Sequence, residues 1–470
     1  MPLSKISRAR VFVGEGALSQ LDDILPRYKN ILLFNDKDGF HPCGAADYFN
    51  QRLLRGGLKQ WVSASVRQCV SESVGQWVSG SVGQKGRRVE GEKVRSSEEG
   101  LKASKPYMSA NSDELYNNRH FDAFAADSVQ SKKPSVGPKG LIGPPCHGVQ
   151  YVSYAGKALP IEEVEEKYRE VKHNPGVDLI IAVGGGTIID IAKIISIAYS
   201  NQCEKVAEIL SDKTLANRLD LIFIPTTAGT GSEATSFAVV YQDKVKISID
   251  HQSLLPTYVV LDPLLLKSLP APVLNSTVLD ALAQAIESIW ARGGTGESRE
   301  YSKEAIGLIL DNLDKENSIE RLSGLQVASH LAGKAINISK TTLPHSISYP
   351  ITSYFGVSHG IAVFLTLPKA AELNYYAAGD TVQQGVQTAD IQKSFAILFS
   401  LFGVAGIDQL RERLMGVMKK LGFSSRLRDY GIGREVLSFL ADNALTKGRS
   451  DNNPRRVDRD DVLRLLEEIY

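Results

Sequence analysis

An apolar run that leads into a glycine-rich turn does most to limit the fold of this chain. Val177–Val183 (VDLIIAV) has the composition of a central strand in a parallel sheet. It leads into Gly184–Thr187 (GGGT), and Ile188–Ala198 then shows the pattern of a helix. Glycines between a strand and a helix allow a pyrophosphate to approach the N–H groups at the start of the helix. Because the turn is not GxGxxG, an ordinary tight turn explains it equally well.

Two further strands end in groups that suit a dinucleotide. Leu219–Ile224 leads into residues 225–233 (PTTAGTGSE), whose hydroxyl groups and glycines suit phosphate and ribose but also suit a capped structural loop. Asn30–Phe34 is followed by Asp36, at the strand end where open parallel sheets bind ligands. We interpret Asp36 as an acid that binds the adenosine ribose, and the alternative is a turn residue or a helix cap.

The remaining periodicities divide the chain into an α/β half and a helical half. In the α/β half we expect strands at 10–13, 149–154 and 255–262, helices at 17–25 and 161–171, and a hairpin of 237–241 with 245–249. From about residue 267 onward the pattern is helical, with helices at 299–313, 319–339, 390–402, 408–421 and 460–468.

Residues 57–149 differ in composition from both halves. Gln60–Gly83 repeats an eight-residue unit (QWVSASVR, QCVSESVG, QWVSGSVG), and a stretch rich in Gly, Ser, Lys and Glu follows. This composition predicts a disordered insertion, although the Trp-Val-Ser alternation would also allow strand pairing. We therefore predict a cofactor-binding domain from residues 1–56 and 150–266, an insertion at 57–149, and a helical metal-binding domain at 267–470.

A candidate metal site lies in the helical half. His345 and His359 are 14 residues apart, which two short helices or a helix with a bend could bring to one point. Upstream, Asp280 and Gln284 are spaced i and i+4 and share one helix face. A carboxylate, an amide and two imidazoles form an oxygen and nitrogen set that suits Fe(II), Zn or Mn.

Charge and cysteine content limit the other classes of function. The net charge is +1 and no basic block alternates with aromatic residues, so we do not expect a nucleic-acid partner. The four cysteines are far apart and predict neither a disulfide framework nor a thiolate zinc site. No apolar run approaches the roughly 20 residues that span a bilayer. We expect a cytoplasmic protein with no membrane partner, and a homodimer is one open expectation.

Several motifs in this order resemble the iron-containing (group III) alcohol dehydrogenases. They are GGGTIID, PTTAGTGSE, LLPTYVVLDP, DALAQAIES and the pair of histidines His345 and His359. The resemblance covers nearly everything outside residues 57–149. It implies an N-terminal Rossmann-like domain and an all-α C-terminal metal-binding domain, as in the dehydroquinate synthase-like architecture. The segment around His345 and His359 resembles the phosphonoacetaldehyde reductase branch of that family.

The resemblance also implies roles for individual residues. Asp36 would favour NAD over NADP. The expected cofactor-binding residues are Asp36, Gly185, Gly186, Thr187, Asp190, Thr226, Thr227, Thr230, Thr235, Phe237 and Lys246. The expected metal ligands are Asp280, Gln284, His345 and His359, and the expected catalytic residues are Tyr349 and Lys246.

This chain departs from the family pattern at two of these positions. The family usually has a histidine where this chain has Gln284, and an amide oxygen is a weaker, neutral ligand. The family often has a second histidine, assigned to proton relay, where this chain has Tyr349. Tyr349 can donate a proton, with a reference pKa near 10. Packing in the core is the alternative role for both residues.

The expected function is metal-dependent hydride transfer between NAD(H) and a small aldehyde or primary alcohol. Phosphonoacetaldehyde or another anionic aldehyde is a candidate substrate, and Lys334 or Lys340 could meet its anion, although both also suit a solvated surface. Three alternatives stay open. They are a dehydroquinate synthase-like lyase or cyclase that uses NAD transiently, a catalytically impaired family member, and a binding module that acts through the repeat.

Overall fold

The computed structural model of the chain describes residues 9–36, 40, 42–53, 148–154, 159–212, 214–242, 245–445 and 448–470. The repeat at 60–83 and nearly all of the predicted insertion at 57–149 lie outside the described residues, so the prediction of disorder stays a prediction. The predicted division between residues 266 and 267 likewise stays a prediction. It falls between the short 3₁₀ helix η7 (Pro263–Leu266) and helix α6 (Ala271–Trp290).

Six parallel strands form the central sheet of the α/β half, in the order β1-β8-β5-β4-β2-β3. Their bounds are Arg10–Val13 for β1, Asn30–Asp36 for β2, Gly148–Tyr154 for β3, Leu179–Gly184 for β4, Asp220–Pro225 for β5 and Tyr258–Leu261 for β8. Every residue of β4 is buried, as its continuous apolar sequence predicts for a strand covered on both faces. The predicted fold class is therefore confirmed.

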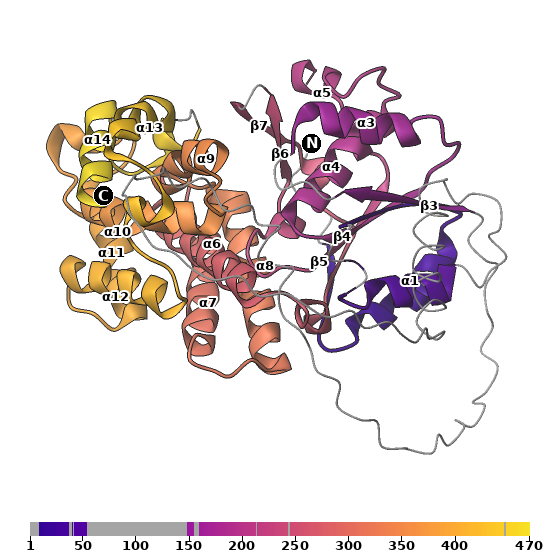
Figure 1. Cartoon of the computed structure of the whole chain (residues 1–470), viewed down its shortest axis with the longest axis horizontal. Helices are drawn as coiled ribbons and strands as arrows, with labels where there is room; N and C mark the ends of the chain where they lie inside the picture. The colour runs from indigo at the N-terminus through magenta and orange to yellow at the C-terminus, as the bar shows by residue number, and fades with distance from the viewer. Residues whose placement is uncertain are drawn as a thin grey trace, which may run out of the picture. The chain divides into compact units, whose positions relative to one another are not determined.

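Alternate residues of the strands build two separate cores on the two faces of the sheet. Leu32 and Ile180 belong to a core covered by α3 (Ile161–Val171) and α4 (Gly186–Ser200). Leu33 and Ile181 point the other way, toward α1 (Ala45–Leu53). Figure 1 shows α3 and α4 on one side of the strands and α1 on the other. The second core continues into the helical half, so the two halves share apolar packing.

The connections of the sheet reverse direction between β2 and β4, which lie side by side. From β2 the chain goes on to β3 at one edge, and from β4 it goes on to β5 on the other side. In open parallel sheets the carboxyl ends at such a reversal form the ligand crevice. Asp36 ends β2 and Gly184 ends β4, so both predicted cofactor groups lie at this point of the sheet.

Three smaller elements complete the α/β half. The predicted hairpin is present as β6 (Phe237–Gln242) paired antiparallel with β7 (Val245–Asp250). Residues 17–25 were expected to form a regular helix but form two 3₁₀ pieces, η2 (Ala17–Asp23) and η3 (Leu25–Arg27). Pro26 has no N–H to donate and restricts the preceding residue, which favours short turns over a continued α-helix. The short helix α5 (Glu208–Ser211) follows α4.

The helical half is built around α6, which is buried along most of its length and packs against α7, α8 and α10. The other helices are α7 (Gly296–Asn312), α8 (Ile319–Ser339), α9 (Leu343–Phe355), α10 (His359–Tyr375), α11 (Thr388–Phe402), α12 (Ile407–Lys420), α13 (Leu437–Ala444) and α14 (Arg459–Glu468). The predicted break between His345 and His359 is real. It follows Gly356, which ends α9 in the left-handed conformation with φ at 68°.

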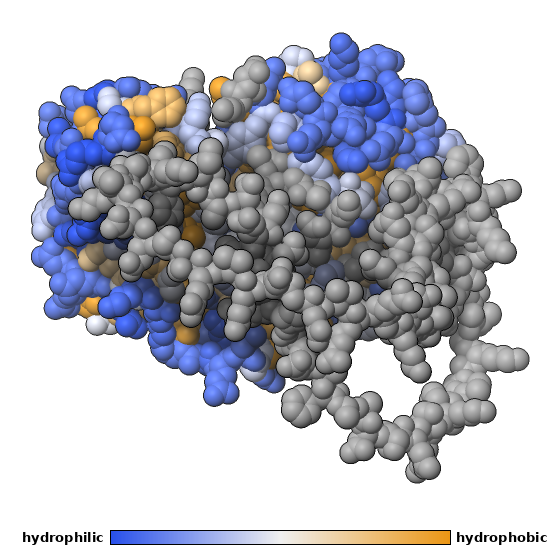
Figure 2. Space-filling view, viewed as in Figure 1, coloured by the Kyte–Doolittle hydropathy of each residue, from blue (hydrophilic) through white to orange (hydrophobic). Residues whose placement is uncertain are grey.

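Hydrophilic residues dominate the described surface on the face shown in Figure 2. Among the described residues, none of the helices is both long enough and apolar enough to cross a membrane by itself. Helices α11 and α12 meet the length and composition test only as a pair bent by 51°. Phe395 and Leu398 of α11 belong to the core of the helical half.

Candidate metal centre

Helix α6 presents three buried polar side chains on one face. Asp280, Gln284 and Glu287 are spaced i, i+4 and i+7 and are exposed by only 4%, 3% and 0%. Buried polar groups in native proteins are almost always paired or bound to an ion. A row of three in the central helix of the bundle therefore needs partners from neighbouring helices.

The first residues of α9 and α10 supply these partners. Thr342 precedes α9, so His345 lies in its first turn, and His359 is the first residue of α10. Gly360 makes the approach of α10 to α6 possible, because a Cβ there would lie 1.9 Å from the carbonyl oxygen of Ser276. The absence of a side chain at residue 360 thus brings His359 next to α6.

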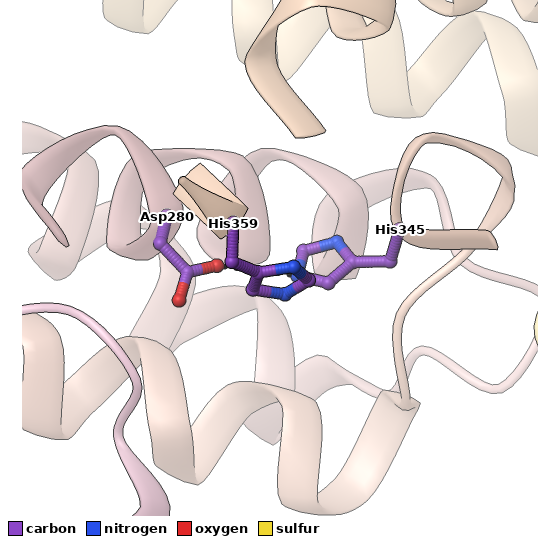
Figure 3. Close-up of side chains that lie close together, drawn as sticks. All are labelled: Asp280, His345 and His359. Carbon is purple, nitrogen blue, oxygen red and sulfur yellow. Dashed lines mark ion pairs between the residues drawn. The ribbon is translucent and has the colours of Figure 1, made fainter. Parts of the chain in front are cut away.

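Asp280, His345 and His359 converge on one point (Figure 3). Each offers one ligand atom, and these atoms all lie within 4.8 Å of one another. His345 Nε2 is 3.3 Å from Asp280 Oδ1, and the two imidazole rings are 5.4 Å apart at 72°. The arrangement suits a divalent cation that prefers imidazole and carboxylate ligands.

Gln284 lies beside this cluster with its amide only partly paired. Its Nε2 donates to the carbonyl of Thr230 at 3.3 Å. Its Oε1 has no hydrogen-bond partner among the residues that the structure describes, although the atom is buried. A buried carbonyl oxygen without a donor is destabilising unless an ion or a water meets it. Its position and its unpaired oxygen fit the role of a fourth, weaker ligand.

Glu287 holds His345 from the side opposite Asp280. One oxygen of Glu287 contacts His345 Nδ1, and the other accepts hydrogen bonds from the N–H and the hydroxyl of Thr342 at 2.9 and 2.8 Å. A carboxylate on Nδ1 orients the ring so that Nε2 faces a metal. Glu287 was not among the residues predicted from the sequence. Its signal was present, since it lies seven residues after Asp280 on the same helix face.

Opposing charges set the protonation of the cluster. Burial alone lowers the pKa of His345, but Glu287 and Asp280 outweigh it and raise that pKa to about 10. Burial lowers the pKa of His359 to about 3, and the nearby positive charge of Lys246 adds to this effect. One imidazole is therefore neutral and ready to coordinate, while a cation has to displace a proton from the other.

Tyr349 lies next to the cluster and contacts two cationic side chains. Its ring stacks on His359 with centroids 6.3 Å apart. Lys246 Nζ lies 3.7 Å above the Tyr349 ring, and Arg449 Nε lies 3.4 Å from the Tyr349 hydroxyl. Burial alone raises the pKa of Tyr349, but Lys246 and Arg449 outweigh it and lower that pKa to about 8. Tyr349 can therefore exchange a proton near neutral pH.

The two glycine- and threonine-rich loops lie against each other at the ends of β4 and β5. The N–H of Thr226 donates to the carbonyl of Gly184 at 3.1 Å, and a Cβ on Gly186 would lie 2.9 Å from the side chain of Thr230. Gly185, Gly186, Thr187, Thr227, Thr230 and Phe237 are all half-buried, whereas Thr226 is buried. This pairing of loops, with α4 starting at Gly186, suits a pyrophosphate.

Asp190 and Thr235 belong instead to a buried network beneath this loop. Asp190 accepts hydrogen bonds from the Ser232 hydroxyl at 2.6 Å and the Val239 N–H at 3.0 Å. Thr235 is only 1% exposed, and its hydroxyl donates to the carbonyl of Ser232 at 3.1 Å. Both residues support the shape of the loop, and their predicted contact with a cofactor stays a prediction.

A buried lysine that the sequence analysis missed lies at the centre of this network. Lys193 is fully buried, and its ammonium group donates to the carbonyls of Ser232, Thr235 and Phe237 at 2.6, 2.8 and 2.9 Å. Burial lowers the pKa of Lys193 to about 8, against the opposing charges of Asp190 and Glu233. A lysine within an apolar helix sequence was the available signal.

Helix α8 connects the loop to the helical half. The α-carbon of Gly333 on α8 lies so close to Gly231 that a Cβ on Gly231 would be 2.5 Å from it. On the same helix, His330 Nδ1 lies 3.2 Å from Glu233 Oε1, and Gln326 donates to the carbonyl of Pro225 at 3.1 Å. With the hydrogen bond from Gln284 to Thr230, these contacts place the loop directly beside the metal cluster.

Comparison with known proteins gives the family. The model described as "Iron-containing alcohol dehydrogenase" matches residues 146–263, and that of "Fe-containing alcohol dehydrogenase family, C-terminal" matches residues 275–470. Phosphonoacetaldehyde reductase of Streptomyces viridochromogenes is 31% identical over 62% of this chain and 76% of its own length. The chain belongs to the iron-containing alcohol dehydrogenase family. It is similar in sequence to the phosphonoacetaldehyde reductase branch of that family, as its motifs predicted.

Other members of the family are similar at lower identity. The NAD-dependent methanol dehydrogenase of Bacillus methanolicus is 28% identical over 62% of this chain and 76% of its own length. The structure of sulfoacetaldehyde reductase from Bifidobacterium kashiwanohense in complex with NAD⁺ has a TM-score of 0.68 at 19% identity, and covers 100% of this chain and 99% of that one. At that identity the likeness shows the fold.

Membership of the iron-containing alcohol dehydrogenases makes this chain an oxidoreductase that acts on alcohols and aldehydes. The departure from the family pattern expected at Gln284 and Tyr349 stays a prediction. In the structure Gln284 donates to the carbonyl of Thr230, and Tyr349 stacks on His359.

Proposed function

We propose that this protein is a metal-dependent NAD(H) oxidoreductase that interconverts a small aldehyde and its primary alcohol. The observation that carries the proposal is the convergence of Asp280, His345 and His359, with ligand atoms within 4.8 Å, beside the Gly185 and Thr230 loops. Fe(II) is the cation that we propose, with Zn as the alternative. The relatives named above, which act on phosphonoacetaldehyde and sulfoacetaldehyde, support an aldehyde with an anionic group as the substrate.

We propose separate roles in the reaction for the metal ligands, Tyr349 and Lys246. Asp280, His345 and His359 would hold the cation, with Gln284 as a weaker ligand. When bound, the nicotinamide supplies a hydride and the cation supplies Lewis-acid polarisation of the carbonyl. Tyr349 would hold the proton that the alcohol oxygen gains or loses. Lys246 stabilises the tyrosinate form of Tyr349 from its position over the ring.

Metal removal and replacement tests this proposal. The purified protein is stripped with a chelator, and NADH loss with short aldehydes is followed before and after Fe(II) or Zn is added. We expect little activity without metal and restored activity with it. His359→Ala should abolish the restoration, whereas His173→Ala, which changes an exposed histidine, should not. If neither metal restores NADH loss, the proposed role of the cluster is wrong.

The same assay separates the proposal from the alternatives. A dehydroquinate synthase-like lyase or cyclase returns its NAD to the starting state, so no net NADH would be consumed. An impaired family member would bind metal and NADH without turnover. Deletion of residues 57–149 without loss of activity would exclude a function that depends on the repeat. Net consumption that matches the alcohol formed is expected only from the proposed oxidoreductase.

We also propose that Asp36 gives a preference for NADH over NADPH. Asp36 ends β2 at the reversal of the sheet, where a carboxylate would repel a 2′-phosphate. Asp36→Ser should therefore raise kcat/KM for NADPH relative to NADH by roughly tenfold or more, which corresponds to about 1.4 kcal/mol. A ratio that does not change would show that Asp36 does not meet the ribose.

A further inference from the structure

Three cations gather around two aromatic rings beside the metal cluster. Lys246 comes from β7, Lys340 follows α8, and Arg449 precedes the short 3₁₀ helix η11 (Ser450–Asn452). Lys340 Nζ and Arg449 Cζ lie 4.6 and 5.8 Å from the centre of the Phe237 ring. Lys246 and Arg449 both contact Tyr349. Segments that are far apart in sequence thus bring positive charge to one place.

The carboxylate at this place forms an ion pair with only one of the three cations, although Asp250 also feels the charge of Arg449. Asp250 forms an ion pair with Lys340 at 2.6 Å and accepts a hydrogen bond from Ser236 at 2.7 Å. Neither Lys246 nor Arg449 forms an ion pair with any carboxylate among the described residues, and both are half-buried. Two partly desolvated cations without counter-ions are costly unless an anion from outside meets them.

Arg449 is well placed to receive such an anion. Its Nε faces the Tyr349 hydroxyl, and its Nη1 makes only a long contact of 3.4 Å with the carbonyl of Gly448. Its Nη2 has no hydrogen-bond partner within the described part of the chain. A guanidinium group presents its donors as a planar fork that matches the oxygens of a phosphonate or sulfonate.

The cations lie close to the reacting centre. Tyr349 contacts both Lys246 and Arg449, and its ring also stacks on that of His359 at 6.3 Å. If the carbonyl oxygen of a substrate lies at Asp280, His345 and His359, these cations would therefore contact a second group of the same substrate. That group would be joined to the carbonyl by only a short chain. Lys334, one of the two lysines that the sequence suggested for an anion, lies instead 3.9 Å over the ring of Tyr301.

We propose that Arg449, together with Lys246, forms an anion subsite that binds the phosphonate or sulfonate group of a short aldehyde substrate. This inference rests on the proposed function and adds the residue that determines substrate class. Arg449 acts as the specificity determinant because its fork binds the anion directly. Lys246 contributes a point charge next to Tyr349.

A comparison of substrates in two variants of Arg449 and one control variant tests this assignment. Arg449→Gln removes the charge and keeps a polar side chain, and Arg449→Lys keeps the charge without the fork. Arg434→Gln is the matched control, because Arg434 also lies over a ring, that of Tyr470 at 4.7 Å, but contacts no residue of the site. Each protein is assayed with NADH and phosphonoacetaldehyde, sulfoacetaldehyde or uncharged propanal.

For Arg449→Gln we expect kcat/KM for both anionic aldehydes to fall by roughly 10- to 100-fold, mainly through KM, because a charge-assisted hydrogen bond is lost. Any loss of kcat that follows from a higher pKa of Tyr349 should be shared by propanal, whereas the KM for propanal and the KM for NADH should change by less than about twofold. All values for Arg434→Gln should also change by less than about twofold. Arg449→Lys should recover part of the loss. A larger loss with phosphonoacetaldehyde than with sulfoacetaldehyde would identify the dianion as the preferred group.

Two results would overturn the subsite. One is an equal loss for propanal and the anionic aldehydes, which would mean that Arg449 only positions Tyr349. The other is an unchanged KM for both anionic aldehydes. If no aldehyde is reduced by any of the proteins, the proposed function is wrong. The anion subsite can still be tested by calorimetric titration of phosphonoacetate into the metal-free protein. Binding at least tenfold weaker in Arg449→Gln than in Arg434→Gln supports it, and equal binding overturns it.

Discussion

Glu287 in the helical half and Lys193 in the α/β half are both fully buried, yet they hold different kinds of group. Glu287 holds a side chain, because its carboxylate binds His345 and Thr342 and so aims an imidazole. Lys193 holds a backbone, because its ammonium group binds the carbonyls of three residues between Ser232 and Phe237. The half proposed to bind metal needs a precise ligand direction, whereas the half proposed to bind the cofactor needs a precise loop shape.

The two groups also differ in how their charge is balanced. Glu287 contacts His345 directly, and that imidazole carries a proton when no cation is bound. Lys193 contacts neutral carbonyls, and its nearest route to a carboxylate runs through the Ser232 hydroxyl to Asp190. We therefore expect Glu287 to be coupled to metal binding and Lys193 to be coupled to folding. The predictions below test that difference.

The largest effect is expected when a ligand of the metal cluster itself is lost. Asp280→Asn replaces a charged ligand by a neutral one between His345 and His359. Metal affinity should fall by more than the roughly 10- to 100-fold that loss of an outer partner costs. Metal titration with elemental analysis measures it, with Asp311→Asn on the exposed face of α7 as the control. Retained metal at one equivalent would contradict the ligand role of Asp280.

Loss of Lys193 is expected to act on stability. Lys193→Met leaves the carbonyl of Thr235 without its donor and leaves that of Phe237 with only the bond from the Thr235 hydroxyl at 3.3 Å. An unpaired buried acceptor costs about 1–3 kcal/mol. The free energy of unfolding in urea should fall by about 2–3 kcal/mol, and NADH affinity should fall as well. Metal affinity should change little. The exposed Lys205→Met is the control, and equal stability of the two variants would contradict the role of Lys193.

Loss of the Glu287 charge should give the reverse pattern. Glu287→Gln keeps the shape but presents an amide N–H, or a weaker acceptor, to His345 Nδ1. We expect metal affinity to fall by roughly 10- to 100-fold, as is usual for such partners. NADH affinity of the metal-free protein should stay unchanged, whereas Lys193→Met lowers it. If Glu287→Gln and Lys193→Met lowered metal affinity and NADH affinity to the same extent, the distinction between the two halves would be wrong.

The α/β half and the helical half also show where prediction from the sequence succeeds and where it does not. Strands such as β4 and helices such as α8 were predicted because their signals are local, namely a continuous apolar run and a 3.6-residue period. The apolar helix sequence around Lys193 hinted at its burial, but its carbonyl partners could not be predicted, because they lie 39 to 44 residues away in the chain. The structure was needed to show that this lysine is buried rather than solvated.

The candidate site divides in the same way. Asp280, His345 and His359 could be singled out by residue type and family resemblance, and the structure brings them together. The role of Gly360, which lets α10 approach Ser276 of α6, could not be predicted from the sequence. Arg449 reaches Tyr349 from 100 residues away, in a segment with no motif. Contacts between distant segments of this kind are fixed by the packing of helices and not by local pattern.

The smallest effect is a dependence of stability on pH that is confined to Lys193. Burial lowers its pKa from 10.5 to about 8, against the charges of Asp190 and Glu233. Between about pH 8 and pH 10.5, Lys193 is protonated in the unfolded chain but has lost its proton in the folded protein. The free energy of unfolding therefore rises with pH in this range. The gap in stability between the wild type and Lys193→Met should widen by about 1 kcal/mol from pH 7 to pH 9.

Whether the stability gap changes with pH decides between two descriptions of the buried ammonium group. A gap that widens means that burial dominates and that Lys193 loses its proton within the folded protein. A gap that stays constant means that the carbonyls of Ser232, Thr235 and Phe237 stabilise the charge enough to keep its ordinary pKa. In that case neutral backbone dipoles would serve Lys193 as well as the opposite charge of His345 serves Glu287, and the contrast in charge balance between the two halves would disappear.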